Sequence, residues 1–201
     1  MRILKDCYLA EIITELFAGK TIVFPTETSY GLGCDATNQG AVNKIFDIKG
    51  RSDDKPLLVV VPTVDMAKKY LIWNNTIEQL ATAHWPGPLT VVGIAQDKTG
   101  LAQGVVSKSG TVAVRVTTSP VAKFLSESLG RPLVATSGNV SGAGDVYSAD
   151  QAATMFAAVA NQPDIILDGG LLPKRLPSTL VDATKNTITV LRQGELKISH
   201  D

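Results

Sequence analysis

The spacing of hydrophobic and polar residues along the chain predicts short helices and strands in alternation. Apolar residues recur every three or four positions in some segments, as in amphipathic helices, whereas brief β-branched or wholly apolar runs that stop at proline or glycine are typical of strands. We expect helices near residues 9–17, 41–48, 64–84 (a helical pair), 120–129 and 149–159. We expect strands near residues 21–24, 57–61, 89–95, 112–116, 133–136, 165–167, 179–181 and 187–192.

Capping signals mark the ends of several predicted helices. Asp6 is placed to cap the start of the first helix, and Gly19 its end. Ser119 precedes a proline at the first position of the helix expected at residues 120–129. Ser148 and Gln151 have the spacing of a capping box, which predicts the start of the helix expected at residues 149–159.

Strands and helices follow one another without the strict alternation of a wholly parallel sheet. This order predicts an α/β fold with a twisted, mixed parallel and antiparallel sheet flanked by helices. The chain has 201 residues, 44% of them hydrophobic, and a chain of this size can bury one core without splitting into two large domains. It has no internal repeat or low-complexity linker, so we expect a single domain over residues 1–201.

Charge and composition narrow the classes of ligand and location. Lys plus Arg (19) equals Asp plus Glu (19), so any site for a polyanion must be a local cluster of cations. The first residues lack the apolar stretch of a signal peptide, and no window approaches the roughly 18 apolar residues of a membrane span, so we expect a cytoplasmic protein that binds no membrane. Two cysteines and two histidines are too few for a disulfide framework or a zinc site. Only Mg²⁺ carried by the phosphates of a ligand stays open.

Two loops rich in hydroxyl groups and glycine follow predicted strands, at residues 25–33 and 135–142. Ligands of open α/β sheets bind at strand ends, where backbone N–H groups beside glycine can approach a phosphate or a small polar molecule. A purely structural turn has a similar composition. Composition alone therefore leaves both interpretations open.

Cations mark a second group of loops. Lys49, Arg51 and Lys55 lie within seven residues of one another, between an apolar helix and an apolar strand. Arg115 and Arg192 each stand at the end of an apolar run. Arginine binds a carboxylate or phosphate bidentately and lysine acts as a point charge, so the pattern suits a triphosphate or a carboxylate. Solvated surface charge is the alternative interpretation.

Taken in order, these loops resemble the signatures of the YrdC-like threonylcarbamoyl-AMP synthase family, over about residues 10–194. The motifs that carry the resemblance are Pro25-Thr26-Glu27-Thr28-Ser29-Tyr30-Gly31-Leu32-Gly33, Lys49-Gly50-Arg51, Lys55-Pro56-Leu57, Trp85-Pro86-Gly87-Pro88-Leu89-Thr90, Val112-Ala113-Val114-Arg115-Val116, Ser137-x-Asn139-x-Ser141-Gly142, Asp168-Gly169-Gly170, Ser178-Thr179 and Leu191-Arg192-x-Gly194. The resemblance implies a nucleotidyltransferase that joins L-threonine, bicarbonate and ATP into threonylcarbamoyl-AMP and pyrophosphate, for the threonylcarbamoyladenosine modification of tRNA position 37. It also implies a positively lined cavity within a twisted mixed sheet.

The same resemblance implies roles for individual residues. Contacts to threonine are expected from Thr28, Arg115 and Ser178. Contacts to ATP are expected from Arg51, Lys55, Thr111, Ser137 and Arg192, with Lys49 and Asn139 completing the anion site. Lys49, Arg51 and Arg115 are the candidate catalytic residues. No side chain is expected to bind a metal directly, and Mg²⁺ is expected only through the phosphates.

The chain also departs from the family pattern. Thr136 and Gly138 stand where many members have proline and alanine, Val60 stands where some have histidine, and residues 144–147 replace a proline-rich stretch. Because the chain ends soon after Arg192, we expect the short, single-domain form, which passes its product to a separate tRNA threonylcarbamoyl transferase complex. The alternative function is a non-catalytic module that binds tRNA or double-stranded RNA in the same basic concavity. Zero net charge and 5% aromatic residues argue against a broad RNA surface, but weak binding in a local groove stays open.

Overall fold

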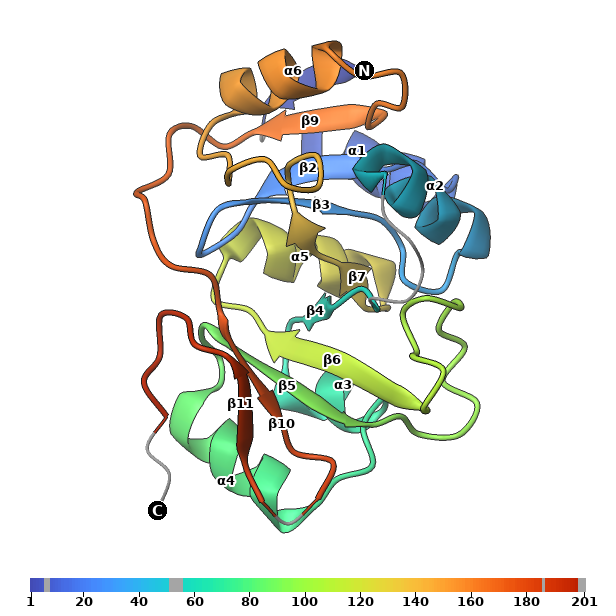
Figure 1. Ribbon diagram of the computed structural model, residues 1–201. Coiled ribbons are helices and arrows are strands. Elements are labelled where there is room, and N and C mark those ends of the chain that lie inside the picture. Colours follow the sequence, from blue (N-terminus) through green and yellow to red (C-terminus); the bar gives the residue numbers. More distant parts are fainter. Residues whose placement is uncertain (6–7, 51–55, 186, 199–201) are drawn as a thin grey trace.

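The computed structural model describes residues 1–5, 8–50, 56–185 and 187–198, and these form two sheets, one above the other in Figure 1. The first sheet has the strand order β1 (Arg2–Lys5), β9 (Ile165–Asp168), β2 (Ile22–Pro25), β3 (Tyr30–Gly33) and β8 (Thr136–Ser137). The second has the order β11 (Thr189–Arg192), β10 (Thr179–Asp182), β5 (Leu89–Ile94), β6 (Thr111–Val116), β4 (Val59–Val61) and β7 (Leu133–Val134). Each sheet contains parallel and antiparallel pairs, which confirms the mixed α/β class.

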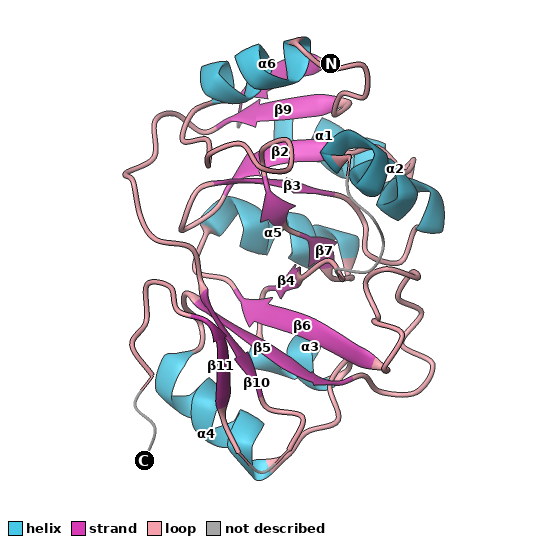
Figure 2. Ribbon diagram, in the orientation of Figure 1, coloured by secondary structure: helices cyan, strands magenta, loops and turns pink. Residues whose placement is uncertain are grey.

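Helices cover both faces of the first sheet (Figure 2). α1 (Leu9–Phe17) and α5 (Pro120–Leu129) bury apolar residues with strands β2 and β9, in a cluster that includes Leu16, Phe24 and Leu125. α2 (Gln39–Lys49) and α6 (Ala149–Ala157) pack apolar residues into the larger core cluster. Because α5 also contacts β4, this helix joins the two sheets.

The second sheet has two helices on the core side of its strands, α3 (Val64–Lys68) and α4 (Asn75–His84). Ile77 and Leu80 of α4 pack in one cluster with Val112 and Val114 of β6. Successive residues of a strand point to opposite faces, so Ala113 and Arg115 point away from these helices. That second face carries the hollows described below. Within the described residues, none of the helices has the length and apolar character needed to span a membrane.

The helix caps follow the sequence closely, with differences in detail. Ser119 Oγ accepts a hydrogen bond from the backbone of Ala122 at 3.3 Å, as an N-cap does. Ser148 Oγ accepts from Gln151 N at 3.2 Å, but the Gln151 side chain accepts from Tyr147 N at 2.8 Å and not from Ser148 N. The second hydrogen bond of the capping box, to the glutamine side chain, therefore comes from the residue before the N-cap. Asp6 lies outside the described residues.

The expected loop at residues 25–33 ends in a strand, β3, which pairs antiparallel with β2. The sheets differ from expectation in three further places. The sequence predicted one twisted sheet, whereas the described residues form two. The predicted strand at 133–136 divides at Ala135: β7 pairs with β4 in the second sheet, and β8 pairs with β3 in the first. β1 was not predicted, because its four residues are mostly exposed and gain their strand conformation from parallel pairing with β9. All three differences depend on which distant strands pair with one another, and the local strand propensity of a segment does not encode its partners.

Candidate active site

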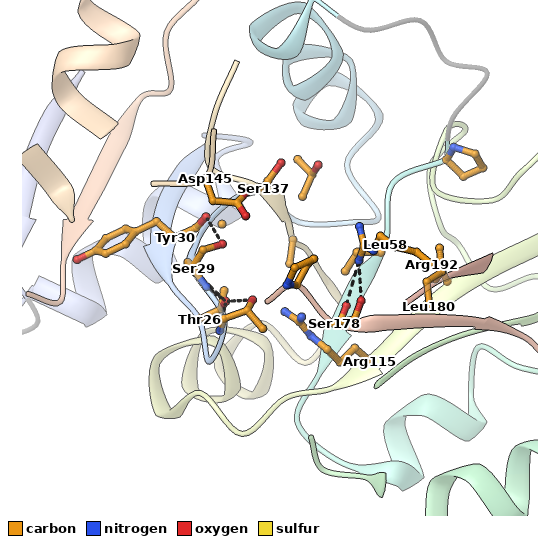
Figure 3. Close-up of a pocket in the computed structure, with 17 residues that line it drawn as sticks. Thr26, Ser29, Tyr30, Leu58, Arg115, Ser137, Asp145, Ser178, Leu180 and Arg192 are labelled. Carbon is orange, nitrogen blue, oxygen red and sulfur yellow. Dashed lines mark hydrogen bonds between the residues drawn. The ribbon is translucent and has the colours of Figure 1, made fainter. Parts of the chain in front are cut away.

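A cavity of about 320 Å³ lies between the two sheets (Figure 3). The first sheet contributes the loop between β2 and β3 and the end of β8, and the second contributes side chains of β6, β10 and β11. The lining residues are Thr26, Thr28, Ser29, Tyr30, Gly31, Pro56, Leu58, Ala113, Arg115, Ala135, Thr136, Ser137, Asp145, Pro177, Ser178, Leu180 and Arg192. All three residues expected to contact threonine are therefore brought together in one cavity.

The loop between β2 and β3 holds its own shape through hydroxyl groups. Thr26 Oγ1 donates to the carbonyl oxygen of Ser29 at 2.7 Å and accepts from the backbone N–H of Thr28 at 3.2 Å. Thr26 and Thr28 are both buried, and their hydroxyls lie 3.1 Å apart. Such side-chain to backbone bonds fix a tight turn without a regular ladder. The loop thus presents Thr28 to the cavity in a defined position.

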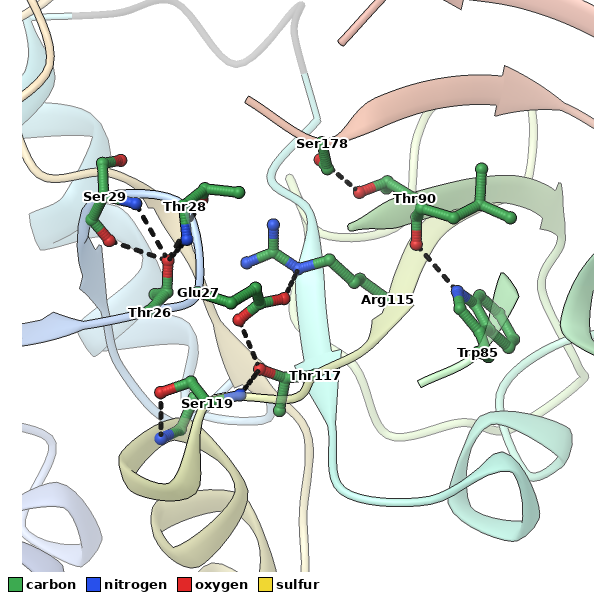
Figure 4. Close-up of polar contacts among 12 residues, drawn as sticks. Thr26, Glu27, Thr28, Ser29, Trp85, Thr90, Arg115, Thr117, Ser119 and Ser178 are labelled. Carbon is green, nitrogen blue, oxygen red and sulfur yellow. Dashed lines mark hydrogen bonds and ion pairs between the residues drawn. The ribbon is translucent and has the colours of Figure 1, made fainter. Parts of the chain in front are cut away.

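Arg115, near the end of β6, forms a buried ion pair with Glu27 of this loop (Figure 4). Arg115 Nε lies 3.1 Å from Glu27 Oε1, and the two side chains are 5% and 7% exposed. Thr117 Oγ1 donates to the other carboxylate oxygen, Glu27 Oε2, at 2.7 Å. Among the described residues, none accepts a hydrogen bond from the two terminal nitrogens of Arg115, which point toward the loop that carries Thr28. These nitrogens can take a carboxylate or phosphate bidentately.

Arg192, at the end of β11, is the second cation that lines the cavity. Its Nη2 donates to the carbonyl oxygen of Ser178 at 2.9 Å, and Ser178 Oγ lies 2.8 Å from the buried Thr90 Oγ1. Burial and the nearby charge of Arg115 lower the pKa of Arg192, and Asp145 opposes them. The two guanidinium groups are close enough to repel each other, so an anion bound between them would stabilise both charges.

Lys49, Ser137 and Asn139 also meet, but the ammonium group of Lys49 points into the loop after β8. Lys49 Nζ donates to the carbonyl oxygens of Ser137 and Asn139 at 2.7 and 2.8 Å, and to Asn139 Oδ1 at 2.6 Å. Its side chain is buried, and neither Lys49 nor Asn139 lines the cavity, whereas Ser137 does. In this structure Lys49 fixes the loop that places Ser137. A direct catalytic role for Lys49 stays a prediction.

Thr111 lies in an adjoining groove of about 1160 Å³ on the same face of the second sheet. The groove shares Pro56, Ala113 and Leu180 with the cavity, so the two hollows lie side by side. Thr111 Oγ1 lies 2.8 Å from the hydroxyl of Ser107. Thr111 therefore does not line the cavity that contains Ser137 and Arg192, and it lies in the hollow beside that cavity.

Two predicted site residues cannot be placed, and two others were missed. Arg51 and Lys55 lie outside the described residues. Glu27 was missed because it stands among hydroxyl residues, and its partner Arg115 is 88 positions away. Asp145, the carboxylate among the lining residues, lies in the stretch that departs from the family pattern. The partner of Glu27 is distant in the chain, so no local signal in the sequence marks this residue.

Comparisons with known proteins show the family to which the chain belongs and support its fold. The model of the Sua5, YciO and YrdC family, described as "Telomere recombination", matches residues 14–194. A protein of Vibrio parahaemolyticus named threonylcarbamoyl-AMP synthase is 33% identical over 187 residues, which cover 92% of this chain and 97% of the relative.

Solved structures are similar over nearly the whole chain. The crystal structure of Pyrococcus abyssi Sua5 in complex with L-threonine has a TM-score of 0.86 and 31% identity, covering 96% of this chain and 57% of the other. This chain thus spans a little over half of that relative. Escherichia coli YciO has a TM-score of 0.81 and 25% identity, covering 96% of this chain and 94% of the other.

Proposed function

Because the chain belongs to the Sua5/YciO/YrdC family, we propose that it is a threonylcarbamoyl-AMP synthase, a nucleotidyltransferase that uses L-threonine, bicarbonate and ATP. The observation that carries the proposal is the convergence of Thr28, Arg115 and Ser178 on one cavity with Arg192 beside them. A relative at 33% identity bears the name of this enzyme, and a structural relative holds L-threonine. The proposed role is the supply of threonylcarbamoyl-AMP for tRNA modification.

Threonine would bind at the end of the cavity nearest the loop between β2 and β3. The terminal nitrogens of Arg115 suit the carboxylate, and the hydroxyls of Thr28 and Ser178 suit the remaining polar groups of an amino acid. A volume of about 320 Å³ lies at the lower end of small-molecule pockets. The cavity therefore accommodates an amino acid and a small co-substrate more readily than a whole nucleotide.

ATP would extend from the cavity into the adjoining groove. Its phosphates would lie toward Arg192 and Ser137, and the rest of the nucleotide would lie along the groove that contains Thr111. Arg51 and Lys55 stay predicted phosphate contacts. Mg²⁺ usually keeps several of its waters, and here it would be carried by the phosphates of ATP. The metal would neutralise phosphate charge.

The reaction needs positioning and charge neutralisation. The threonine amine attacks the carbon of bicarbonate and forms a carbamate with loss of water. The resulting carbamate oxygen attacks the α-phosphorus and expels pyrophosphate. No protein nucleophile is required. Arg115 would hold the carboxylate so that the amine faces the cavity, and Arg192 would stabilise negative charge on phosphate oxygens.

The decisive experiment measures pyrophosphate release by the wild-type protein with ATP, bicarbonate, Mg²⁺ and each amino acid in turn. We expect release that depends on both threonine and bicarbonate. Equal release with every amino acid would indicate another adenylation reaction. No release, together with salt-sensitive binding of tRNA, would instead support the non-catalytic RNA-binding module. We further propose that the product passes to a separate tRNA threonylcarbamoyl transferase complex in the cytoplasm.

A further inference from the structure

Glu27 and Arg115 join the two walls of the cavity. Glu27 belongs to the loop between β2 and β3 of the first sheet, and Arg115 to β6 of the second. The pair is almost fully buried, at 5% and 7% exposure. A buried charge is costly unless it is paired, so each side chain restrains the other. The contact therefore sets the distance between the two walls at the point where they face each other.

The carboxylate of Glu27 occupies only one side of the guanidinium group. Its Oε1 lies 3.1 Å from Nε, yet within the described part of the chain these two buried atoms lack an aligned hydrogen bond. Its Oε2 is held by the hydroxyl of Thr117, two residues beyond Arg115 on the chain. The carboxylate is thus fixed from the second sheet and leaves both terminal nitrogens of Arg115 for a ligand.

The same contact fixes Thr28. Glu27 immediately precedes Thr28 in a loop that is already closed by Thr26, and the start of α5 adds a further tie, because Ser119 Oγ donates to the carbonyl oxygen of Pro25 at 3.0 Å. Movement of Glu27 would therefore move Thr28 as well. Two proposed threonine contacts, which come from different sheets, depend on one carboxylate for their relative position.

We propose that Glu27 is a positioning residue for threonine: it holds the guanidinium of Arg115 and the hydroxyl of Thr28 at the separation that the amino acid bridges. The inference rests on the proposed function. It assigns Glu27 no contact with substrate, because its carboxylate oxygens face Arg115 and Thr117. Threonine binding should therefore depend on where the Glu27 carboxylate lies, and not only on its charge.

Two substitutions separate position from charge. Glu27→Asp keeps the charge but shortens the side chain by one methylene, so the carboxylate cannot reach both partners from the same backbone position. Glu27→Gln keeps the shape but removes the charge. We expect Glu27→Asp to raise the KM for threonine by about tenfold or more, the effect of losing one well-placed hydrogen bond to a charged group, and Glu27→Gln to raise it by less, because the shape is kept. The KM for ATP should change by less than about twofold in both.

A matched control exists in a second buried carboxylate. Asp35 is buried and pairs with Arg131 at 2.7 Å, and it does not line the cavity. Asp35→Asn should lower the melting temperature as Glu27→Gln does but leave the KM for threonine unchanged. If the Glu27 variants fail to fold, Thr117→Val serves in their place, since it frees Oε2 with both charges intact, and we expect a rise of about threefold in the threonine KM.

The outcomes separate the inference from the proposed function. Absence of threonine-dependent pyrophosphate release in the wild type refutes the proposed function and the inference with it. Release by the wild type with an unchanged threonine KM in Glu27→Asp refutes only the positioning role. Equal rises in the KM for threonine and ATP, or the same rise in Asp35→Asn, would show general destabilisation and would also overturn it.

Discussion

Replacing Arg115 by methionine would separate what the arginine does for folding from what it does for substrate. Methionine has a similar length and no charge, so Glu27 would keep its buried position without its ionic partner. Both side chains are nearly inaccessible to water, at 5% and 7% exposure, so solvent screens the pair little. Removing one partner of a buried pair costs about 3–5 kcal/mol, because the remaining charge is uncompensated. For a chain of this length that corresponds to a fall of about 6–20 °C in melting temperature.

A second substitution should then recover the stability but not the activity. In Arg115→Met combined with Glu27→Gln the uncompensated charge is gone, and the amide can still accept from Thr117. We expect most of the lost melting temperature to return, whereas threonine-dependent pyrophosphate release stays absent, because the carboxylate of the substrate has lost its guanidinium.

Circular dichroism melts and the pyrophosphate assay together test this reasoning. Lys123→Met is the surface control, because Lys123 and Glu127 are about half exposed and their pair at 3.9 Å should contribute little. A melting temperature of Arg115→Met equal to that of the wild type would refute the energetic argument. Threonine-dependent turnover by the double variant would refute the assignment of Arg115 to the substrate.

Three further predictions address other parts of the molecule. Thr111→Val should raise the KM for ATP by about tenfold in initial-rate assays and leave that for threonine unchanged, since Thr111 lies in the adjoining groove. Burial raises the pKa of Asp164, but hydrogen bonds from Thr21 and Lys20 together lower it by more, so the pKa lies below its ordinary value. Its stabilisation is therefore present above the unfolded pKa and is lost as the pH falls through the folded one. Urea unfolding should show Asp164→Asn to be less stable than the wild type by about 1 kcal/mol at pH 7, and this difference should shrink as the pH falls below the unfolded pKa. Gly33→Ala should lower the melting temperature strongly, because its Cβ would lie 1.9 Å from the carbonyl oxygen of Val134.

Much of the secondary structure follows from local signals. Ser119 with its following proline, and Ser148, begin helices where the sequence predicts, because capping depends on residues within one turn. Ala135 shows the limit. It lies within a run of strand-forming residues, and only the positions of Leu58 and Cys34, far away in the chain, decide that the run leaves one sheet and enters the other.

The site was predictable in composition and less so in geometry. Arg115 and Arg192 stand near the carboxyl ends of β6 and β11, where ligand-binding residues of α/β folds gather, and they line one cavity with Ser178, which precedes β10. The burial of Lys49 under the Ser137 loop could not be read from its basic neighbourhood, because a lysine at the end of a helix is usually exposed. Glu27 gave no local sign of its partner for the same reason that Ala135 gave no sign of its sheet.

The order in which the chain visits the two sheets has a consequence for how the molecule comes apart. The chain builds β1 to β3 in the first sheet, β4 to β7 in the second, returns for β8 and β9, and finishes with β10 and β11. No single cut of the chain places the strands of the two sheets on separate fragments. Neither sheet is therefore a separate stretch of chain, and the two should unfold together in one cooperative transition.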